Sequence, residues 1–330
     1  MATSPVTVGT AYSWTPTTTG GTAPYTYSVG SGTLPAGTTL NTSTGEVHGT
    51  LTTVASYTFV IHVVDSVSNS ANSPSETVVV NADAVALSIY NKIANAAGGE
   101  GAYWDISETG SSGFGVIRAD KANGNDLGLV GTVSIVNGPR GSGDNATNAT
   151  SGAGYLTRTR TSNDALDVPA APNQKYCLFG FVKFNSATTT ANVGGTYQGA
   201  SAPNGGCLLI EVGSSISGYS GDTVSGNWCH ADTSIPDTTN WHFYTVWRDN
   251  SDGKLRISID GGTPVASPTT CAAPQTSISF NILTGSGNPE AAVSRWGWIK
   301  GDYLTGTEQT WMVNSGNGRN WAEIKALAGH

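Results

Sequence analysis

Short segments in which apolar and polar residues alternate recur along this 330-residue chain, and turn residues separate them. The clearest is 254–260, in which Leu255, Ile257 and Ile259 alternate with polar residues. Successive side chains of a β-strand point to opposite faces, so this pattern predicts a strand with three apolar side chains inward and the polar ones in solvent. The Asn-Ser-Asp-Gly sequence at 250–253 predicts a tight hairpin before it. Segments of this kind restrict the chain to a nearly all-β fold.

The segment 57–64 carries apolar residues on both faces, which is typical of a central strand in a sandwich. Helices are expected near the C-terminus, where Thr305 and Glu308 form a capping-box pattern and Gly316 ends the helix. Asn320 and Glu323 give a second, weaker helix start, whereas 84–93 fits either a strand or a helix. Further strands are expected at 77–80, 176–184, 207–212, 242–249, 277–283 and 294–300.

Composition excludes several kinds of partner. Charged residues make up 12% of the chain and the net charge is −8, with no lysine or arginine cluster that could follow a phosphate backbone, so we expect neither nucleic acid nor anionic lipid to bind. No segment approaches the ~20 apolar residues that span a bilayer, and the start lacks the pattern of a secretory signal peptide. The 43 glycines and the hydroxyl- and amide-rich surface are typical of fibres and shells of secreted or virion proteins.

The segmentation predicts two domains. Residues 1–82 are expected to form an immunoglobulin-like β-sandwich, because short strands alternate with turn sequences. Residues 83–101 are expected to connect the domains, since they contain the breaker sequence Ala-Ala-Gly-Gly. Residues 102–330 are expected to form one larger jelly-roll sandwich, a size that a single all-β unit can reach.

The run SGTLPAGTTLNTSTGEVHGTLTTVASYTFVIHVVDSVSNSA, residues 31–71, resembles an Ig-like repeat family of bacteria and phages. It contains that family's LPxGL-type turn, its STGxIxGTPT hairpin and its YTFTVTVTD strand. It departs at Thr39, where an apolar residue is usual, and at Leu51, where proline is usual. The resemblance implies a spacer or adhesive module without a catalytic set.

Three motifs of the second module occur in the order found in the laminin-G-like, concanavalin A-like lectin and glucanase family, which they resemble. They are AYWDISETG at 102–110, WHFYTVWRD with GKLRISIDGG at 241–262, and the end of the chain from Trp296 through Leu304 to Asn314–Arg319. The resemblance implies a jelly roll. With the first module, the pattern looks like phage virion proteins such as head decorations, head fibres and tail appendages.

The four cysteines show no metal-ligand spacing, so a zinc site is not expected. Cys177 and Cys207 begin apolar runs and are expected to be buried thiols. Cys229 and Cys271 lie in polar surroundings and could form a disulfide in an oxidising medium, although the sequence does not fix the pairing.

No catalytic motif emerges. Glycosidases of the jelly-roll fold place carboxylates as E-x-D-x-x-E on one strand face, and this sequence has no such motif. The stretch 218–222 lacks the last glycine of a G-x-S-x-G elbow and is expected to be a polar turn. The glycine-rich stretch 141–154 lacks the lysine and the helix of a phosphate loop and is expected to be a plain loop. The sequence therefore predicts a protein that is not an enzyme.

Laminin-G-like domains sometimes hold Ca²⁺ at the sheet rim, so the resemblance implies Ca²⁺ as the one candidate cofactor. Asp120 and Asp126 are the candidate metal ligands. Loop aspartates more often bind their own backbone in turns, and that alternative remains for both. It also covers three further loop aspartates: Asp144, Asp249 and Asp252.

Aromatic residues give the remaining lead, because sugars stack on exposed rings. Trp228 and His230 lie in the polar stretch 226–232, and Tyr219 is close in sequence, so this region is the predicted ligand surface, near a loop. Five other tryptophans belong to strand motifs and are expected in the core: Trp104, Trp241, Trp247, Trp296 and Trp298.

The leading hypothesis is a non-enzymatic protein on the virion surface, present in many copies or as a homo-oligomer. Its expected partners are capsid or tail proteins, cell-surface glycans, or both. A bacterial extracellular adhesin or carbohydrate-binding protein is the alternative, and a glycoside hydrolase the third hypothesis.

Overall fold

The structure is a computed structural model that divides into two units. Residues 1–88 and 322–330 form the first unit and residues 89–321 the second. The boundary falls inside helix α1 (Ala84–Ala94), and the last nine residues belong to the first unit, although the sequence assigned them to the second module. The described residues are 4–94, 101–104, 127–131, 133–149, 154–159, 175–185, 190–196, 208–212, 215–222, 227–271, 279–284 and 291–330.

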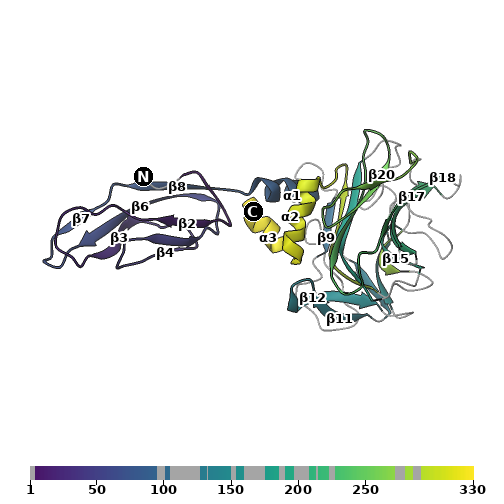
Figure 1. The fold of residues 1–330 in the computed structure, drawn as a ribbon, viewed down its shortest axis with the longest axis horizontal. Coiled ribbons are helices and arrows are strands. Elements are labelled where there is room, and N and C mark those ends of the chain that lie inside the picture. Colours follow the sequence, from purple (N-terminus) through teal and green to yellow (C-terminus); the bar gives the residue numbers. More distant parts are fainter. Residues whose placement is uncertain are drawn as a thin grey trace. The chain divides into compact units, whose positions relative to one another are not determined.

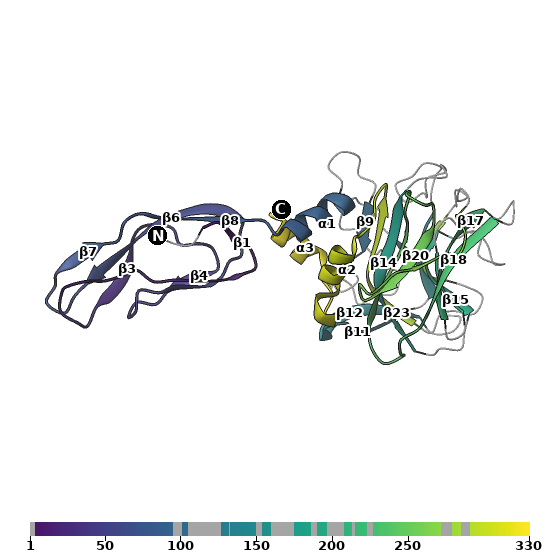
Figure 2. The ribbon, with the colours of Figure 1, turned by 45° about the horizontal axis from the view of Figure 1, so that its top comes forward.

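The first unit consists of two sheets (Figures 1 and 2). Strand β6 is central in one of them and buries Phe59 and Ile61, as the pattern at 57–64 predicts. Leu327 of helix α3 (Trp321–Ala328) packs against the core of this unit, and its carbonyl accepts the amide of Asp83 at 2.8 Å. One sheet has the order β1 (Val6–Thr7), β8 (Glu76–Asn81), β6 (Ala55–Val64), β3 (Thr26–Gly32), with β7 (Ser70–Asn72) also on β6; the other has β2 (Ala11–Trp14), β5 (Val47–Thr50), β4 (Thr38–Leu40).

The second unit is also built of two sheets, so the predicted all-β class with short C-terminal helices is confirmed. One sheet has the order β10 (Gly128–Gly131), β13 (Gly154–Thr159), β22 (Ser279–Thr284), β15 (Thr190–Thr196), β16 (Leu208–Val212), β17 (Ser215–Asp222), β18 (Asn227–Ser234). The other has β11 (Ser134–Gly138), β12 (Gly141–Ala149), β23 (Ala291–Lys300), β14 (Tyr176–Phe184), β19 (His242–Arg248), β20 (Leu255–Ile259), β21 (Val265–Ala266), with β9 (Gly101–Trp104) also on β23.

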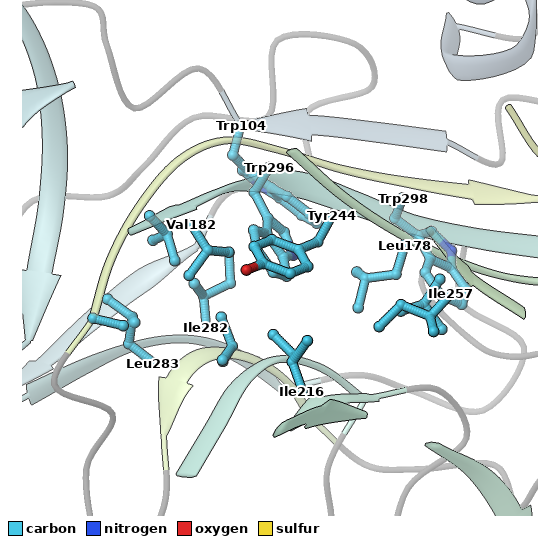
Figure 3. Close-up of a cluster of buried hydrophobic side chains, with 14 of the residues drawn as sticks. Trp104, Leu178, Val182, Ile216, Tyr244, Ile257, Ile282, Leu283, Trp296 and Trp298 are labelled. Carbon is cyan, nitrogen blue, oxygen red and sulfur yellow. The ribbon is translucent and has the colours of Figure 1, made fainter. Parts of the chain in front are cut away.

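Side chains from both sheets of the second unit meet in one core. Figure 3 shows Trp104, Trp296 and Trp298 on one side of this core and Ile216 and Ile282, from the other sheet, on the opposite side. All five side chains are fully buried, and burial of apolar surface at this scale is the main force that holds such sheets together. Of the five tryptophans expected in the core, four are buried and Trp241 is half-buried.

The outer face of the β20 sheet is covered by the C-terminal segment, which corrects one expectation about β20. Ser258 was expected in solvent, but it is 2% exposed and donates a 2.8 Å hydrogen bond to Gln309 of α2 (Gly306–Val313). The predicted capping box is present, since Thr305 accepts the amide of Glu308 and Glu308 accepts that of Thr305. The helix ends at Val313, before the predicted Gly316, because Asn314 adopts the left-handed conformation that closes it; a short 3₁₀ helix η1 (Asn314–Gly316) follows.

Two expected turns are strands. The glycine-rich stretch that begins at Gly141 forms β12, in which Ala146, Thr147 and Asn148 are buried. The stretch 218–222 belongs to β17, where a Cβ on Gly218 would lie 2.7 Å from the Cγ1 atom of Val246. Glycine and serine have low strand propensity, and in both strands packing against neighbours overrides it. No helix among the described residues is long and apolar enough to cross a membrane.

Candidate functional site

The candidate site lies on strands β17 and β18, at one edge of the seven-stranded sheet. Ile216 and Cys229 from these strands lie in the core, so the residues between them in the alternation point to the opposite face. There Tyr219 is paired directly with His230, and Ser217 with Asp232. These four residues are the β17–β18 patch.

The aromatic rings of the patch form a stacked pair. The centroids of Tyr219 and His230 are 5.4 Å apart, and the rings are inclined by 22°. The Nδ1 atom of His230 lies 2.8 Å from a carboxylate oxygen of Asp232, and the two side chains are 44% and 48% exposed. Burial, and then the charge of Asp232, raise the pKa of Tyr219, so its hydroxyl stays protonated at neutral pH.

Two packing features hold the patch in place. Gly218 lets β17 approach Val246 of the opposite sheet, because a Cβ at this position would be too close to the Val246 side chain. A disulfide joins Cys229 to Cys271, whose Cα atoms are 5.1 Å apart, so the pairing that the sequence left open is formed. The carbonyl of Cys271 in turn accepts a 2.6 Å hydrogen bond from the buried guanidinium of Arg248.

The remaining two cysteines were expected to be buried thiols. Cys177 is buried and free, and desolvation raises the pKa of its thiol to about 12. It is therefore not a reactive nucleophile at neutral pH. Cys207 lies outside the described residues.

The structure brings Tyr219 and His230 together, but on strands and not beside a loop. The polar stretch that contains His230 is the edge strand β18, because its cysteine and alanine alternate inward. Trp228 is two residues before His230 in that strand and pairs with Gly221; its side chain lies outside the described residues. Asp232 was not singled out from the sequence, although strand alternation from His230 would have placed it beside the imidazole.

The patch offers recognition chemistry. Its rings present a flat apolar surface, and the Asp232 carboxylate at its rim can accept hydrogen bonds, whereas Ser217 is buried. Among the described residues, Asp232 is the hydrogen-bond partner of the His230 imidazole. The arrangement fits the binding of a ligand with both C–H and hydroxyl groups.

The described part of the chain contains no set of side chains that could serve as calcium ligands. Asp120 and Asp126 lie outside the described residues. Asp144 was expected in a loop but lies in β12, buried, with Oδ1 2.6 Å from Arg295. Asp249 and Asp252 accept backbone amides of their own turn, from Ser251 and Lys254, as the turn alternative predicts. Within the described ranges, no group of three His, Cys, Asp or Glu side chains could hold a metal.

A second polar cluster lies at the start of β19, around His242. His242 lies between two carboxylates, with Nδ1 2.7 Å from Asp260 and Nε2 3.2 Å from Asp237. The hydrogen bond to Asp260 raises the pKa of His242. Hydrogen bonds from Asn240 and Thr239 hold the pKa of Asp237 well below its usual range. The cluster ties a turn to a strand, which is a structural task.

Comparison with known proteins supports part of this picture. Residues 1–81 match the model of the family described as "Putative Ig domain", which confirms the Ig-like assignment of the N-terminal module. No curated protein matches the sequence.

Two similar solved structures illustrate the structural matches. The binding domain of botulinum neurotoxin serotype C1 has 12% sequence identity, with 66% of this chain and 52% of that chain covered, at a TM-score of 0.48. The binding domain of botulinum neurotoxin DC in complex with rat synaptotagmin II has 11% identity, with 65% and 51% covered, at 0.47. The chain thus spans about half the length of these solved chains. At these values, nothing about ligand or activity follows for this chain.

Proposed function

We propose that this chain is a non-enzymatic surface protein whose second unit binds glycans through the β17–β18 patch. The observation that carries the proposal is the stacked pair of Tyr219 and His230, with Asp232 at hydrogen-bond distance, on the last two strands of the sheet. A sugar ring has an apolar C–H face and a rim of hydroxyls, so an aromatic surface beside a carboxylate matches both parts.

A glycan array with the full chain tests this proposal. Tyr219→Ala removes the larger ring of the stack and should weaken binding to the recognised glycans by about tenfold or more, as loss of a central aromatic contact does. His230→Ala should act in the same direction. His48→Ala is the matched control, because His48 is an exposed strand histidine of the first unit and should not change binding. Equal glycan binding by wild type and Tyr219→Ala would reject the patch as the site.

The finer part of the proposal places the protein on a phage particle, in many copies, with capsid or tail proteins as partners. Its support is the hydroxyl- and amide-rich, glycine-rich composition together with the order of an Ig-like and a lectin-like module. Mass spectrometry of purified particles should find the chain at many copies per particle. Its absence from particles that retain their heads and tails would end this placement.

A bacterial adhesin on the cell surface is the second candidate, and the Cys229–Cys271 disulfide favours it, because disulfides persist mainly outside the reducing cytosol. Surface labelling of intact producing cells separates the two placements. An adhesin is labelled before lysis, whereas a virion protein released by lysis is not. For a glycoside hydrolase, the third hypothesis, we expect no turnover of any glycan that the array identifies.

A further inference from the structure

We infer that the first unit contains a second binding site, a groove for an uncharged saccharide. The groove encloses about 470 Å³ and lies between the segment 15–21 and strands β3, β6 and β7. This volume falls in the range of roughly 300–1,000 Å³ that small-ligand sites occupy. The site is independent of the β17–β18 patch, since all its residues belong to the first unit.

The groove exists because the chain leaves strand β2 at Trp14 without joining another ladder. Residues 15–19 have no regular structure, and Pro16 cannot donate a ladder hydrogen bond. Two tyrosines of the neighbouring sheet hold this segment above the groove. The hydroxyl of Tyr25 donates to the carbonyl of Gly20 at 2.7 Å, and the hydroxyls of Tyr27 and Thr18 are 2.9 Å apart.

Aromatic rings supply the apolar part of the lining. Trp14 and Tyr25 line the groove and are half-buried, so each keeps part of its ring accessible. Trp14 packs edge-on against Phe59, with 5.6 Å between centroids and 76° between planes, and this contact fixes its orientation. A ring held in this way can receive the C–H face of a sugar, because the negative face of an aromatic ring attracts polarised C–H bonds.

Polar groups with a fixed orientation also line the groove. Asp65 accepts four hydrogen bonds, from the amides of Thr22, Val67 and Asn69 and from the side chain of Asn69, at 2.8–3.0 Å. The side-chain amide of Asn69 is thereby oriented at the groove, in a wall with many hydroxyls and amides. These are Thr15, Thr17, Thr18, Thr19, Ser70, Asn72 and Ser73.

The charges of the lining exclude an acidic ligand. Asp65 and Glu76 line the groove, and the lining contains no lysine, arginine or histidine. A sialylated, sulfated or uronic-acid sugar would be repelled by these carboxylates, and no cation in the lining would compensate. A neutral sugar is not repelled in this way. A lining with rings, hydroxyls and two carboxylates, and with no cationic side chain, therefore selects uncharged saccharides.

An array of neutral oligosaccharides and their sialylated counterparts, applied to the full chain, tests this inference. Thr17→Trp fills the groove from the 15–21 segment, and Ser70→Trp fills it from β7. Both residues are exposed, so neither change removes a core contact. Ser28→Trp is the matched control, because Ser28 is exposed on β3 but does not line the groove. Thermal unfolding of each variant verifies that the first unit is folded.

We expect a set of neutral glycans that wild type, Ser28→Trp and Tyr219→Ala bind equally and that both groove-filling variants bind at least about tenfold more weakly. Sialylated counterparts should bind no better than background in Tyr219→Ala, which leaves the groove as the remaining site. If no glycan distinguishes the filling variants from Ser28→Trp, the groove inference is wrong, whatever Tyr219→Ala shows. If the distinguished glycans are acidic, the assigned ligand class is wrong.

Discussion

At the residue scale, Arg295 in β23 has an unusual backbone conformation. Its φ of 50° is left-handed, and it lies where the pairing with β14 shifts register between Phe179 and Phe181. This is the geometry of a β-bulge, in which one strand carries an additional residue. The bulge buries the guanidinium completely, and Nη2 lies 2.6 Å from Oδ1 of Asp144 in β12. The ion pair thus ties the bulge to the neighbouring strand.

Breaking this pair should be costly. Arg295→Met leaves the carboxylate of Asp144 buried without its cation, so we expect the free energy of unfolding to fall by about 3–5 kcal/mol, measured by urea denaturation. The double variant Arg295→Met with Asp144→Leu should recover most of this loss. Arg256→Met is the matched control, because its pair with Asp252 is partly exposed and should contribute less than about 1 kcal/mol. A similar loss in both single variants would contradict the argument.

At the element scale, a titratable residue, His242, connects the start of β19 to two other segments. It contacts Asp237 in the 237–240 turn and Asp260, which follows β20. The Asp260 amide in turn donates to the Phe243 carbonyl, and its Oδ1 accepts the Phe243 amide, each at 2.8 Å. The folded state thus holds the protonated imidazole between two carboxylates. The raised pKa of His242 records the same preference.

This preference predicts a pH dependence. Because the pKa of His242 is higher in the folded than in the unfolded state, its stabilising contribution is complete below about pH 6.5 and disappears as the pH rises through the folded pKa. Wild type should therefore exceed His242→Gln in melting temperature at about pH 5, with a gap that shrinks toward about pH 9. Thermal unfolding of both proteins across this range measures it. A constant gap would show that the imidazole does not titrate in this range.

Strongly apolar strands could be predicted from sequence, whereas the polar strands that form the patch could not. The range 176–184 coincides with β14, because its apolar residues are covered on both faces. Strands β12 and β17 were missed because their glycine, asparagine and serine residues carry no alternation signal. Strand β17 fits against the opposite sheet because Gly218 has no Cβ that would contact Val246. Tyr219 and His230 were selected from the sequence as parts of one ligand surface because they lie close in sequence. Their direct pairing depends on a hairpin register that the sequence does not encode locally.

At the scale of the whole molecule, the Cys229–Cys271 bond is the covalent link across the second unit. Its partners are 42 residues apart in sequence, and closing such a loop stabilises a protein by roughly 2–4 kcal/mol. A reductant should therefore lower the free energy of unfolding of the wild type by about this amount. The variant Cys229→Ala with Cys271→Ala should be less stable than oxidised wild type, and reductant should not change its free energy of unfolding. A wild type whose free energy of unfolding is also unchanged by reductant would contradict the predicted contribution.

The first unit is discontinuous, because residues 89–321 are inserted between its two segments. Residues 322–330 are made by the ribosome only after the whole insertion, so an emerging chain that ends before them lacks the side chain of Leu327. The Ig-like sandwich thus gains this contact with its core only when synthesis has passed the other unit. A nascent polypeptide that stalls inside the insertion therefore carries a first unit without the packing contact of Leu327.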